Sequence, residues 1–236
     1  MLRLALLALL ISTSQIALGA ECVILLHGLA RTPKSLKVLE AELREQQYDV
    51  VNLGYPSRKH PIATLANIAI KPALAQCLDK NSKAIHVVTH SLGGILVRQY
   101  LANNSIERLG RVVMLAPPNQ GSEVVDALGR TPGFRWLNGP AGLQLGTKLP
   151  GSVPKSLGPV NFDLGVIAGT RSINRVLSLY LPNPDDGKVS VASTKVDGMT
   201  DHLVVPHSHP FMMRNRGVIS QVIHYLREGR FQRDGV

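Results

Sequence analysis

The chain has 236 residues, of which 44% are apolar, together with 21 glycines and 15 prolines. This composition is that of a globular protein and supports one sizeable core, so we expect a single folded domain. The formal net charge is +10, but the basic residues are scattered and form no run interleaved with aromatic residues. The sequence therefore predicts no nucleic-acid partner. Contact with an anionic membrane surface is the alternative to a simply solvated basic surface.

The first twenty residues have the pattern of a secretory signal peptide. Arg3 supplies the basic start and an unbroken apolar run covers 4–11. Cleavage after Gly19 fits the preference for small residues just before a signal-peptide cleavage site better than cleavage after Ala20. The apolar run is about half of the ~20 residues that a bilayer span needs, which disfavours an uncleaved anchor. We therefore expect export to the periplasm or beyond, with a mature catalytic domain covering 21–236.

The chain has two cysteines. Cys22 stands at the start of a predicted strand and Cys77 stands inside a predicted helix. Export places both thiols in an oxidising compartment, so we predict a disulfide between them. Two buried free thiols are the alternative, because the sequence does not give the separation of the Cα atoms.

Apolar runs alternate with helical patterns along the chain, which predicts an α/β fold with a mostly parallel sheet and helices on both faces. About six strands are expected, at 22–26, 48–53, 84–88, 111–115, 164–168 and 202–205. The helical patterns cover 36–47, 62–78, 95–103 and 216–227. Pro72 is expected to kink or split the second helix, because proline removes a backbone donor.

Residues 129–159 follow neither periodicity. Glycine and proline are frequent there, so backbone turns are expected to dominate. The segment also contains Phe134, Trp136, Leu137 and Leu143, which favours packing beside a binding cleft. We therefore expect an excursion that partly covers the functional site.

The most informative pattern is Thr-His-Ser-Leu-Gly-Gly at 89–94, directly after the apolar run at 84–88 and directly before a helical stretch. A serine hydroxyl is a weak nucleophile unless the fold exposes it, and a sharp turn from strand to helix does this. Ser91 is therefore the candidate nucleophile. The alternative is that Ser91 only caps a helix.

The candidate partners of Ser91 stand later in the chain. His209 follows the last predicted strand and precedes the last helix, which is where a catalytic histidine belongs in this kind of sheet. His207 is its close rival. Asp186, directly before a glycine in a tight turn, is the candidate carboxylate. The acids ranked below it are Asp185, Asp163, Asp197 and Asp201.

Two backbone N–H groups are candidates for an oxyanion hole. Leu29 follows His27-Gly28 at the end of the first predicted strand, and Leu92 opens the helix after Ser91. One donor of this kind can lower a reaction barrier by about 3 kcal/mol. The two N–H groups are therefore expected to contribute about as much to catalysis as the side chains of Ser91, His209 and Asp186.

Taken together, the motifs resemble an α/β-hydrolase of the small bacterial lipase and esterase type. The residues that carry the resemblance are His27-Gly28-Leu29, 89–94, Pro117-Pro118-Asn119-Gln120-Gly121-Ser122, Asp186-Gly187 and His209. The resemblance implies a reduced version of the family's fold that lacks the first two of the usual strands. One departure is Thr89, which stands where the G-x-S-x-G pattern has a glycine.

The expected function is cleavage of carboxylic esters, including lipids, by a Ser-His-Asp triad through an acyl-enzyme and without a cofactor. An acyltransferase or thioesterase with the same triad is the nearest alternative. A non-catalytic lipid-binding or assembly factor is another. No zinc spacing is present, and residues 197–201 lack a regular calcium loop, so no metal is expected. The sequence does not predict the oligomeric state.

Overall fold

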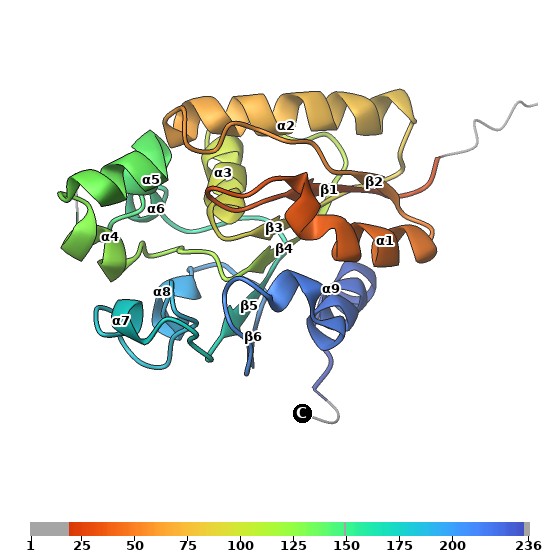
Figure 1. The fold of residues 1–236 in the computed structure, drawn as a ribbon. Coiled ribbons are helices and arrows are strands. Elements are labelled where there is room, and N and C mark those ends of the chain that lie inside the picture. Colours follow the sequence, from red (N-terminus) through yellow and green to blue (C-terminus); the bar gives the residue numbers. More distant parts are fainter. Residues whose placement is uncertain (1–18, 149, 234–236) are drawn as a thin grey trace, which may run out of the picture.

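The structure is a computed structural model that describes residues 19–148 and 150–233. The predicted leader therefore lies outside the described residues except for Gly19 and Ala20. Within the described part, six strands form one sheet in the order β2-β1-β3-β4-β5-β6, and every neighbouring pair is parallel (Figure 1). The strands are β1 (Cys22–Leu26), β2 (Asp49–Val51), β3 (Ile85–His90), β4 (Leu109–Leu115), β5 (Leu164–Gly169) and β6 (Asp201–Val205). The predicted fold class is confirmed.

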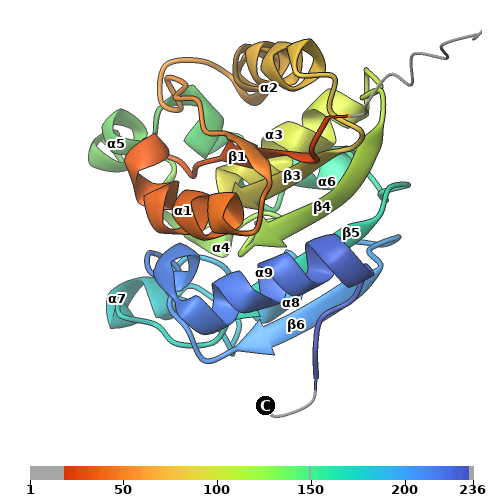
Figure 2. The same ribbon diagram turned by 90° about the vertical axis from the view of Figure 1, so that its right-hand side faces the viewer.

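Helices cover both faces of the sheet (Figure 2). One face carries α2 (Ile62–Asp79) and α3 (Leu92–Leu101), and the other carries α1 (Lys37–Glu45) and α9 (Arg216–Glu228). Shorter elements connect them: η1 (Pro33–Leu36), α4 (Glu123–Leu128), α5 (Pro132–Leu143), α6 (Val153–Ser156), α7 (Arg175–Ser178), α8 (Val191–Thr194) and η2 (Met212–Arg214). Among the described residues, none of the helices combines the length and apolar character needed to cross a membrane.

Strand residues alternate between two apolar cores. In β1, Ile24 and Leu26 pack toward α2 and α3, whereas Val23 and Leu25 pack toward α1 and α9. Because both faces are covered, a central strand can be apolar at every position, which explains the continuous apolar runs in the sequence. The buried strands therefore hold the loops at their carboxyl ends in fixed positions.

A disulfide joins Cys22 to Cys77, as the sequence predicts, with the two Cα atoms 5.8 Å apart. This separation is common for disulfides. The bond links the first residue of β1 to the last turns of α2, and both cysteines are fully buried. It therefore anchors the strand whose far end leads into the loop with Leu29.

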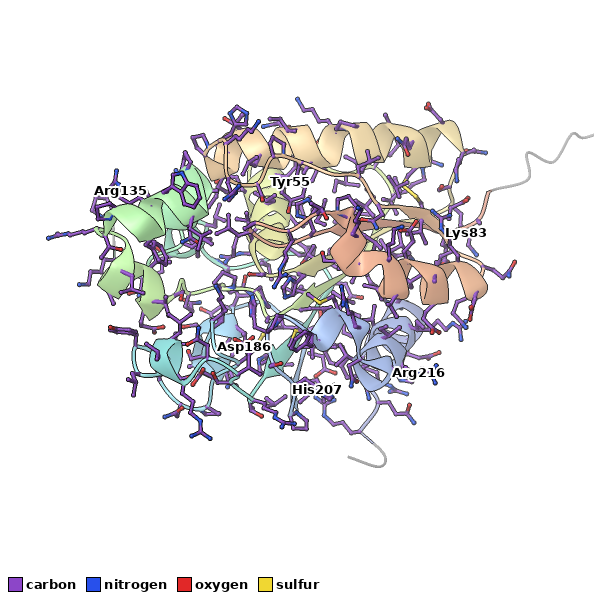
Figure 3. All side chains as sticks on the ribbon, viewed as in Figure 1. Tyr55, Lys83, Arg135, Asp186, His207 and Arg216 are labelled. Carbon is purple, nitrogen blue, oxygen red and sulfur yellow. A yellow bond between two sulfur atoms is a disulfide. The ribbon has the colours of Figure 1, made fainter. Side chains whose placement is uncertain are left out.

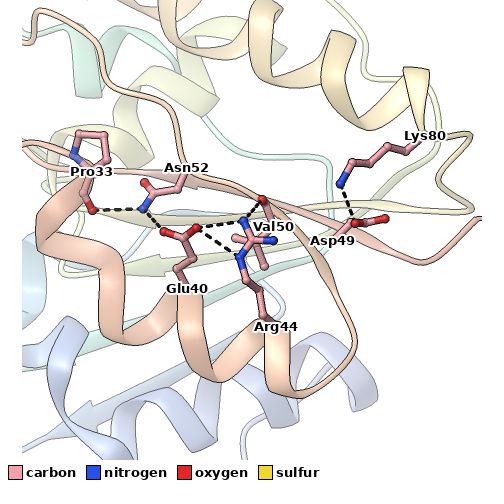
Figure 4. A network of polar contacts seen from close by, with 7 residues as sticks. All are labelled: Pro33, Glu40, Arg44, Asp49, Val50, Asn52 and Lys80. Carbon is pink, nitrogen blue, oxygen red and sulfur yellow. Dashed lines mark hydrogen bonds and ion pairs between the residues drawn. The ribbon is translucent and has the colours of Figure 1, made fainter.

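The edge strand β2 is held by polar contacts with two helices (Figure 4). Arg44 in α1 pairs with Glu40 at 2.9 Å and donates to the carbonyl oxygen of Val50 at 2.7 Å. Lys80, just after α2, pairs with Asp49 at 2.7 Å. These contacts attach a strand of three residues to the sheet, and β1 therefore lies in the interior of the sheet with a partner on each side.

The chain path excludes one of the two outcomes expected at Pro72 and contradicts a second sequence prediction. The helix α2 continues through Pro72 as one element, so the helix is not split. Residues 129–159 are not dominated by turns, because α5 and α6 lie within them. The backbone of α5 bends at Gly139, where φ is 62° and ψ is −171°. Glycine and proline in this segment begin and redirect short helices, which a search for long periodic patterns misses.

Candidate active site

Ser91 occupies the turn between β3 and α3, with φ 53° and ψ −119°. This backbone conformation is costly for a residue with a side chain and persists only where the surroundings enforce it. The amide of Ser91 donates to the carbonyl oxygen of Leu115 at 2.9 Å, and its own carbonyl oxygen accepts from Gly94 at 3.0 Å. The turn thus holds a partly buried serine at the carboxyl end of β3.

Glycines let α3 approach the sheet closely behind this turn. A Cβ atom at Gly93 would lie 2.6 Å from the carbonyl oxygen of Leu26, and one at Gly94 would lie 3.3 Å from Oγ1 of Thr89. Thr89 is buried, and its hydroxyl has no hydrogen-bond partner among the described residues. The threonine at the family's glycine position therefore fits because position 94 has no side chain.

Asp186 and His209 form a buried pair. Nδ1 of His209 lies 2.8 Å from Oδ2 of Asp186, and the exposed fractions of the two residues are 6% and 1%. The other carboxylate oxygen accepts from the N–H groups of Lys188 at 3.0 Å and Val189 at 2.9 Å. A carboxylate fixed in this way accepts the Nδ1–H of the imidazole, which leaves Nε2 as the proton acceptor.

The rival residues have other neighbours. The carboxylate of Asp185 accepts from the Ser178 hydroxyl and the Gly187 amide, both at 2.7 Å. His207 lines a separate hollow of about 390 Å³. Figure 3 shows Asp186 and His207 in the lower part of the molecule, with Tyr55 in the upper part. The structure thus brings Asp186 to His209, and not to His207.

Two more of the rival acids are paired with arginines. Asp163 contacts Arg111 at 3.2 Å, and Asp201 pairs with Arg233. Asp201 also accepts from the amide of Phe231 at 2.8 Å. Across residues 19–148 and 150–233, no three His, Cys, Asp or Glu side chains come together as a metal site.

Ser91 and His209 line one cavity of about 200 Å³. Much of its wall is apolar and is formed by Leu29, Val124, Val125, Phe134, Leu137 and Leu145. Phe134 and Leu137 belong to α5, so this helix lies against the site. Within the described residues, no hydrogen bond joins the Ser91 hydroxyl to His209. Such contacts often tighten only when substrate binds.

The two predicted oxyanion donors lie on adjacent loops. A Cβ atom at Gly28 would lie 3.3 Å from Cβ of Ser91, so the loop after β1 touches the turn that leads into Leu92. The amides of Leu29 and Leu92 have no protein acceptor in the described part of the chain. Two unpaired amides beside a serine can stabilise a developing negative charge.

The loop after β1 is fixed from below by His27 and Tyr55. Their rings stack with centroids 4.0 Å apart, and the Tyr55 hydroxyl donates to the carbonyl oxygen of His27. Nε2 of His27 accepts from the amide of Tyr55 at 3.4 Å. Burial lowers the pKa of His27, so its ring is neutral near pH 7 and serves as packing and hydrogen-bond support.

His90 links the two sides of the site, a role that the sequence pattern did not reveal. Its Nε2 lies 2.9 Å from the carbonyl oxygen of His209, and the ring centroids of the two histidines are 4.7 Å apart. Burial holds the pKa of His90 well below its usual value, and the nearby His209 lowers it further. The neutral ring therefore donates its Nε2–H to the loop of His209. A contact between residues 119 positions apart is not indicated by any local sequence pattern.

A buried network, also missed from the sequence, holds the segment after β4. Arg98 donates to the carbonyl oxygen of Asn119 at 2.9 Å and to that of Gly158 at 2.6 Å, and burial lowers its pKa to about 10. Asn119 donates in turn to the carbonyl oxygen of Thr194 at 2.8 Å. The network fixes Asn119, which lies between Pro118 and Ser122, two residues that line the cavity.

Comparisons with known proteins agree with this architecture. The model of a family described as the alpha/beta hydrolase family matches residues 23–218. A lipase of Bacillus licheniformis in mature form aligns with a TM-score of 0.69 at 14% identity, over 91% of this chain and 94% of that chain. No curated protein matches the sequence.

Two further solved structures share the fold. A phospholipase of Legionella pneumophila aligns with a TM-score of 0.63 at 21% identity, over 88% of this chain and 58% of that chain. A metagenomic carboxyl esterase aligns with a TM-score of 0.63 at 17% identity, over 90% of this chain and 76% of that chain. Identities this low support a common fold and leave the substrate open.

Proposed function

The chain belongs to the alpha/beta hydrolase family, and from this premise we propose that it is a serine hydrolase that cleaves carboxylic esters. The observation that supports the proposal most is the arrangement around one cavity. A strained serine and a histidine bound to a buried carboxylate both line its wall. Ser91 acts as the nucleophile, His209 as the general base and Asp186 as the residue that orients the base.

The reaction proceeds through an acyl-enzyme. Nε2 of His209 takes the proton of the Ser91 hydroxyl while Oγ attacks the ester carbonyl. The N–H groups of Leu29 and Leu92 stabilise the oxyanion, and Asp186 stabilises the imidazolium. The imidazolium then gives its proton to the departing alcohol. Water, deprotonated by the same imidazole, releases the acid and restores Ser91.

The residues around the cavity suggest how the substrate is held. Phe134 and Leu137 of α5 and Leu145 after it provide apolar contacts for an acyl chain. Residues 129–159 therefore act as a partial cover over the acyl group. Excluding water from the cavity strengthens the electrostatic contacts at the reacting carbonyl.

Export is the second part of the proposal. The disulfide between Cys22 and Cys77 supports it, because such bonds persist in oxidising compartments. Fractionation of cells that express the full chain, followed by mass spectrometry of the mature N-terminus, tests this directly. We expect an N-terminus at residue 20 or 21 outside the cytoplasm, and a full-length cytoplasmic protein would contradict export.

A fluorophosphonate probe tests the catalytic proposal. We expect covalent labelling of the wild type and none of Ser91→Ala. Ser122→Ala is the matched control, because Ser122 lines the same cavity but its hydroxyl donates to the carbonyl oxygen of Lys188 at 2.9 Å. Labelling that persists in Ser91→Ala would falsify the assignment. Analysis of products from an ester and an added alcohol separates hydrolysis from acyl transfer.

A further inference from the structure

Two basic side chains, Arg31 and Lys188, line the cavity that contains Ser91 and His209. Among the described residues that line the cavity none is acidic, and the carboxylate of Asp186, which contacts His209, is buried. Within the described residues, neither cation forms an ion pair. The proposed active site is therefore lined by two positive charges that form no ion pair within the described part of the chain.

Both cations extend from fixed backbone next to the proposed machinery. The amide of Arg31 donates to the carbonyl oxygen of Gly28 at 3.2 Å, and Arg31 follows Leu29 by two residues. The amide of Lys188 donates to the carboxylate of Asp186 at 3.0 Å. One cation thus follows the oxyanion loop and the other follows the turn with the acid. A group held by both lies close to the reacting carbonyl.

The two positive charges also influence each other. Desolvation lowers the pKa of Lys188, and the charge of Arg31 lowers it further, while Asp186 opposes the shift. Two like charges that line the same cavity repel each other, and an anion between them removes the repulsion. The geometry thus favours a negatively charged ligand over a neutral one.

A second hollow, of about 610 Å³, adjoins the cavity and shares Arg31 and Leu137 with it. Its lining adds Arg58 and Lys59, together with Trp136, which is 80% exposed. The described residues that line it also include no acidic side chain. Basic and apolar side chains therefore continue side by side from the cavity outward, which suits a ligand that is both anionic and apolar.

We propose that the substrates are anionic amphiphiles, namely acyl esters with a phosphate group a few atoms from the scissile bond, and that Arg31 and Lys188 bind that group. The acyl chain occupies the apolar cavity, and the rest of the molecule lies along the adjoining hollow. This inference rests on the ester hydrolysis proposed above and names its substrate class. The guanidinium of Arg31 offers paired donors to phosphate oxygens, and Lys188 adds a second charge.

The test compares two esters with the same acyl chain, a 1-acylglycerol 3-phosphate and the uncharged 1-acylglycerol, below the concentrations at which they form micelles. We expect kcat/KM of the wild type to be about tenfold higher for the phosphate ester, as one or two charge-assisted hydrogen bonds provide. In the double variant Arg31→Gln with Lys188→Gln, the ratio of the two kcat/KM values should fall to about one. Added salt should lower the wild-type ratio.

Lys34→Gln is the matched control, because Lys34 is an exposed lysine of η1 that lines neither hollow. Its ratio should equal that of the wild type. Inorganic phosphate alone should inhibit only weakly, since it lacks the acyl chain. Equal hydrolysis of both esters together with strong inhibition by inorganic phosphate indicates a free-phosphate site and overturns the proposal.

The fluorophosphonate probe separates this inference from the proposed function. If labelling depends on Ser91 but the wild-type ratio is one, or the double variant keeps the wild-type ratio, only the anionic-substrate inference is overturned. If the wild type is not labelled at all, the ester-hydrolase proposal fails and this inference fails with it.

Discussion

The two sides of the proposed site are held by different interactions. On the side of the serine, glycine backbone packs closely against its neighbours, since a Cβ atom at Gly28 would lie 2.8 Å from Nδ1 of His90 and one at Gly93 would lie 2.6 Å from the carbonyl oxygen of Leu26. On the side of the base, Asp186 and His209 are held by hydrogen bonds to each other and to backbone amides. A closely packed position can accept a larger side chain only if a strand or helix moves. A single hydrogen bond, in contrast, can be removed without moving the backbone. Substitutions on the first side should therefore reduce stability, and those on the second should reduce catalysis.

The largest expected effect is on the polar side. Asp186→Asn should lower kcat by about 10⁴-fold, because the amide cannot accept the Nδ1–H and favours the wrong imidazole tautomer. Folding should be nearly unchanged, since the side-chain oxygen of asparagine can still accept from the amides of Lys188 and Val189. Ester hydrolysis and urea denaturation measure the two effects. Asp185→Asn is the control, and a larger loss of kcat in that variant would show that the carboxylate is misassigned.

The packed side is tested by Gly93→Ala. The added methyl group meets the carbonyl oxygen of Leu26, so we expect a loss of about 2 kcal/mol in the free energy of unfolding. Gly133→Ala is the matched control, because a Cβ atom at Gly133 has no neighbour within 4 Å. That variant should be neutral or slightly more stable. Similar melting temperatures for the two variants would contradict the packing argument.

His90 connects the two sides, and its substitution should have a smaller effect on catalysis. His90→Phe keeps a ring but removes the donor to the carbonyl oxygen of His209, so kcat should fall about tenfold with little change in KM. His90→Gln keeps a hydrogen-bond donor, so its kcat should fall by a smaller factor. A larger loss of kcat in His90→Gln than in His90→Phe, measured by steady-state kinetics, would mean that ring packing rather than the hydrogen bond positions His209.

The smallest effect is a pH dependence of stability. Because the pKa of His90 is lowered in the folded state, the unfolded chain binds the proton more readily as the pH falls. The contribution of this histidine to the free energy of unfolding is therefore fully present above its unfolded pKa of about 6.5. It should fall by about 1 kcal/mol between pH 7.0 and 5.5. Urea denaturation of the wild type and His90→Gln at both pH values should show a shallower decline in the variant. An equal decline in the free energy of unfolding of the two proteins would indicate that His90 titrates normally.

Much of the fold could be predicted because its signals are local. The strand, the serine and the helix around Ser91 are contiguous, so the turn follows from a few residues. The disulfide required only two cysteines and an expected compartment. The expectation that turns dominate residues 129–159 is wrong because α5 and α6 are rich in glycine and proline, and such helices depend on packing rather than on their own propensity.

The sequence by itself determined the order of the six strands and the four long helices, the covered parallel sheet and a serine at a strand-to-helix turn, because these depend on side-chain periodicity and backbone preferences of adjacent residues. Only the tertiary structure decided that Asp186 rather than Asp185 meets His209, that His90 holds the loop of that histidine, and that Thr89 fits beside Gly94. In each case the choice turns on the direction of a side chain across a long stretch of chain. That direction is set by how the strands and helices pack, and no local pattern encodes it.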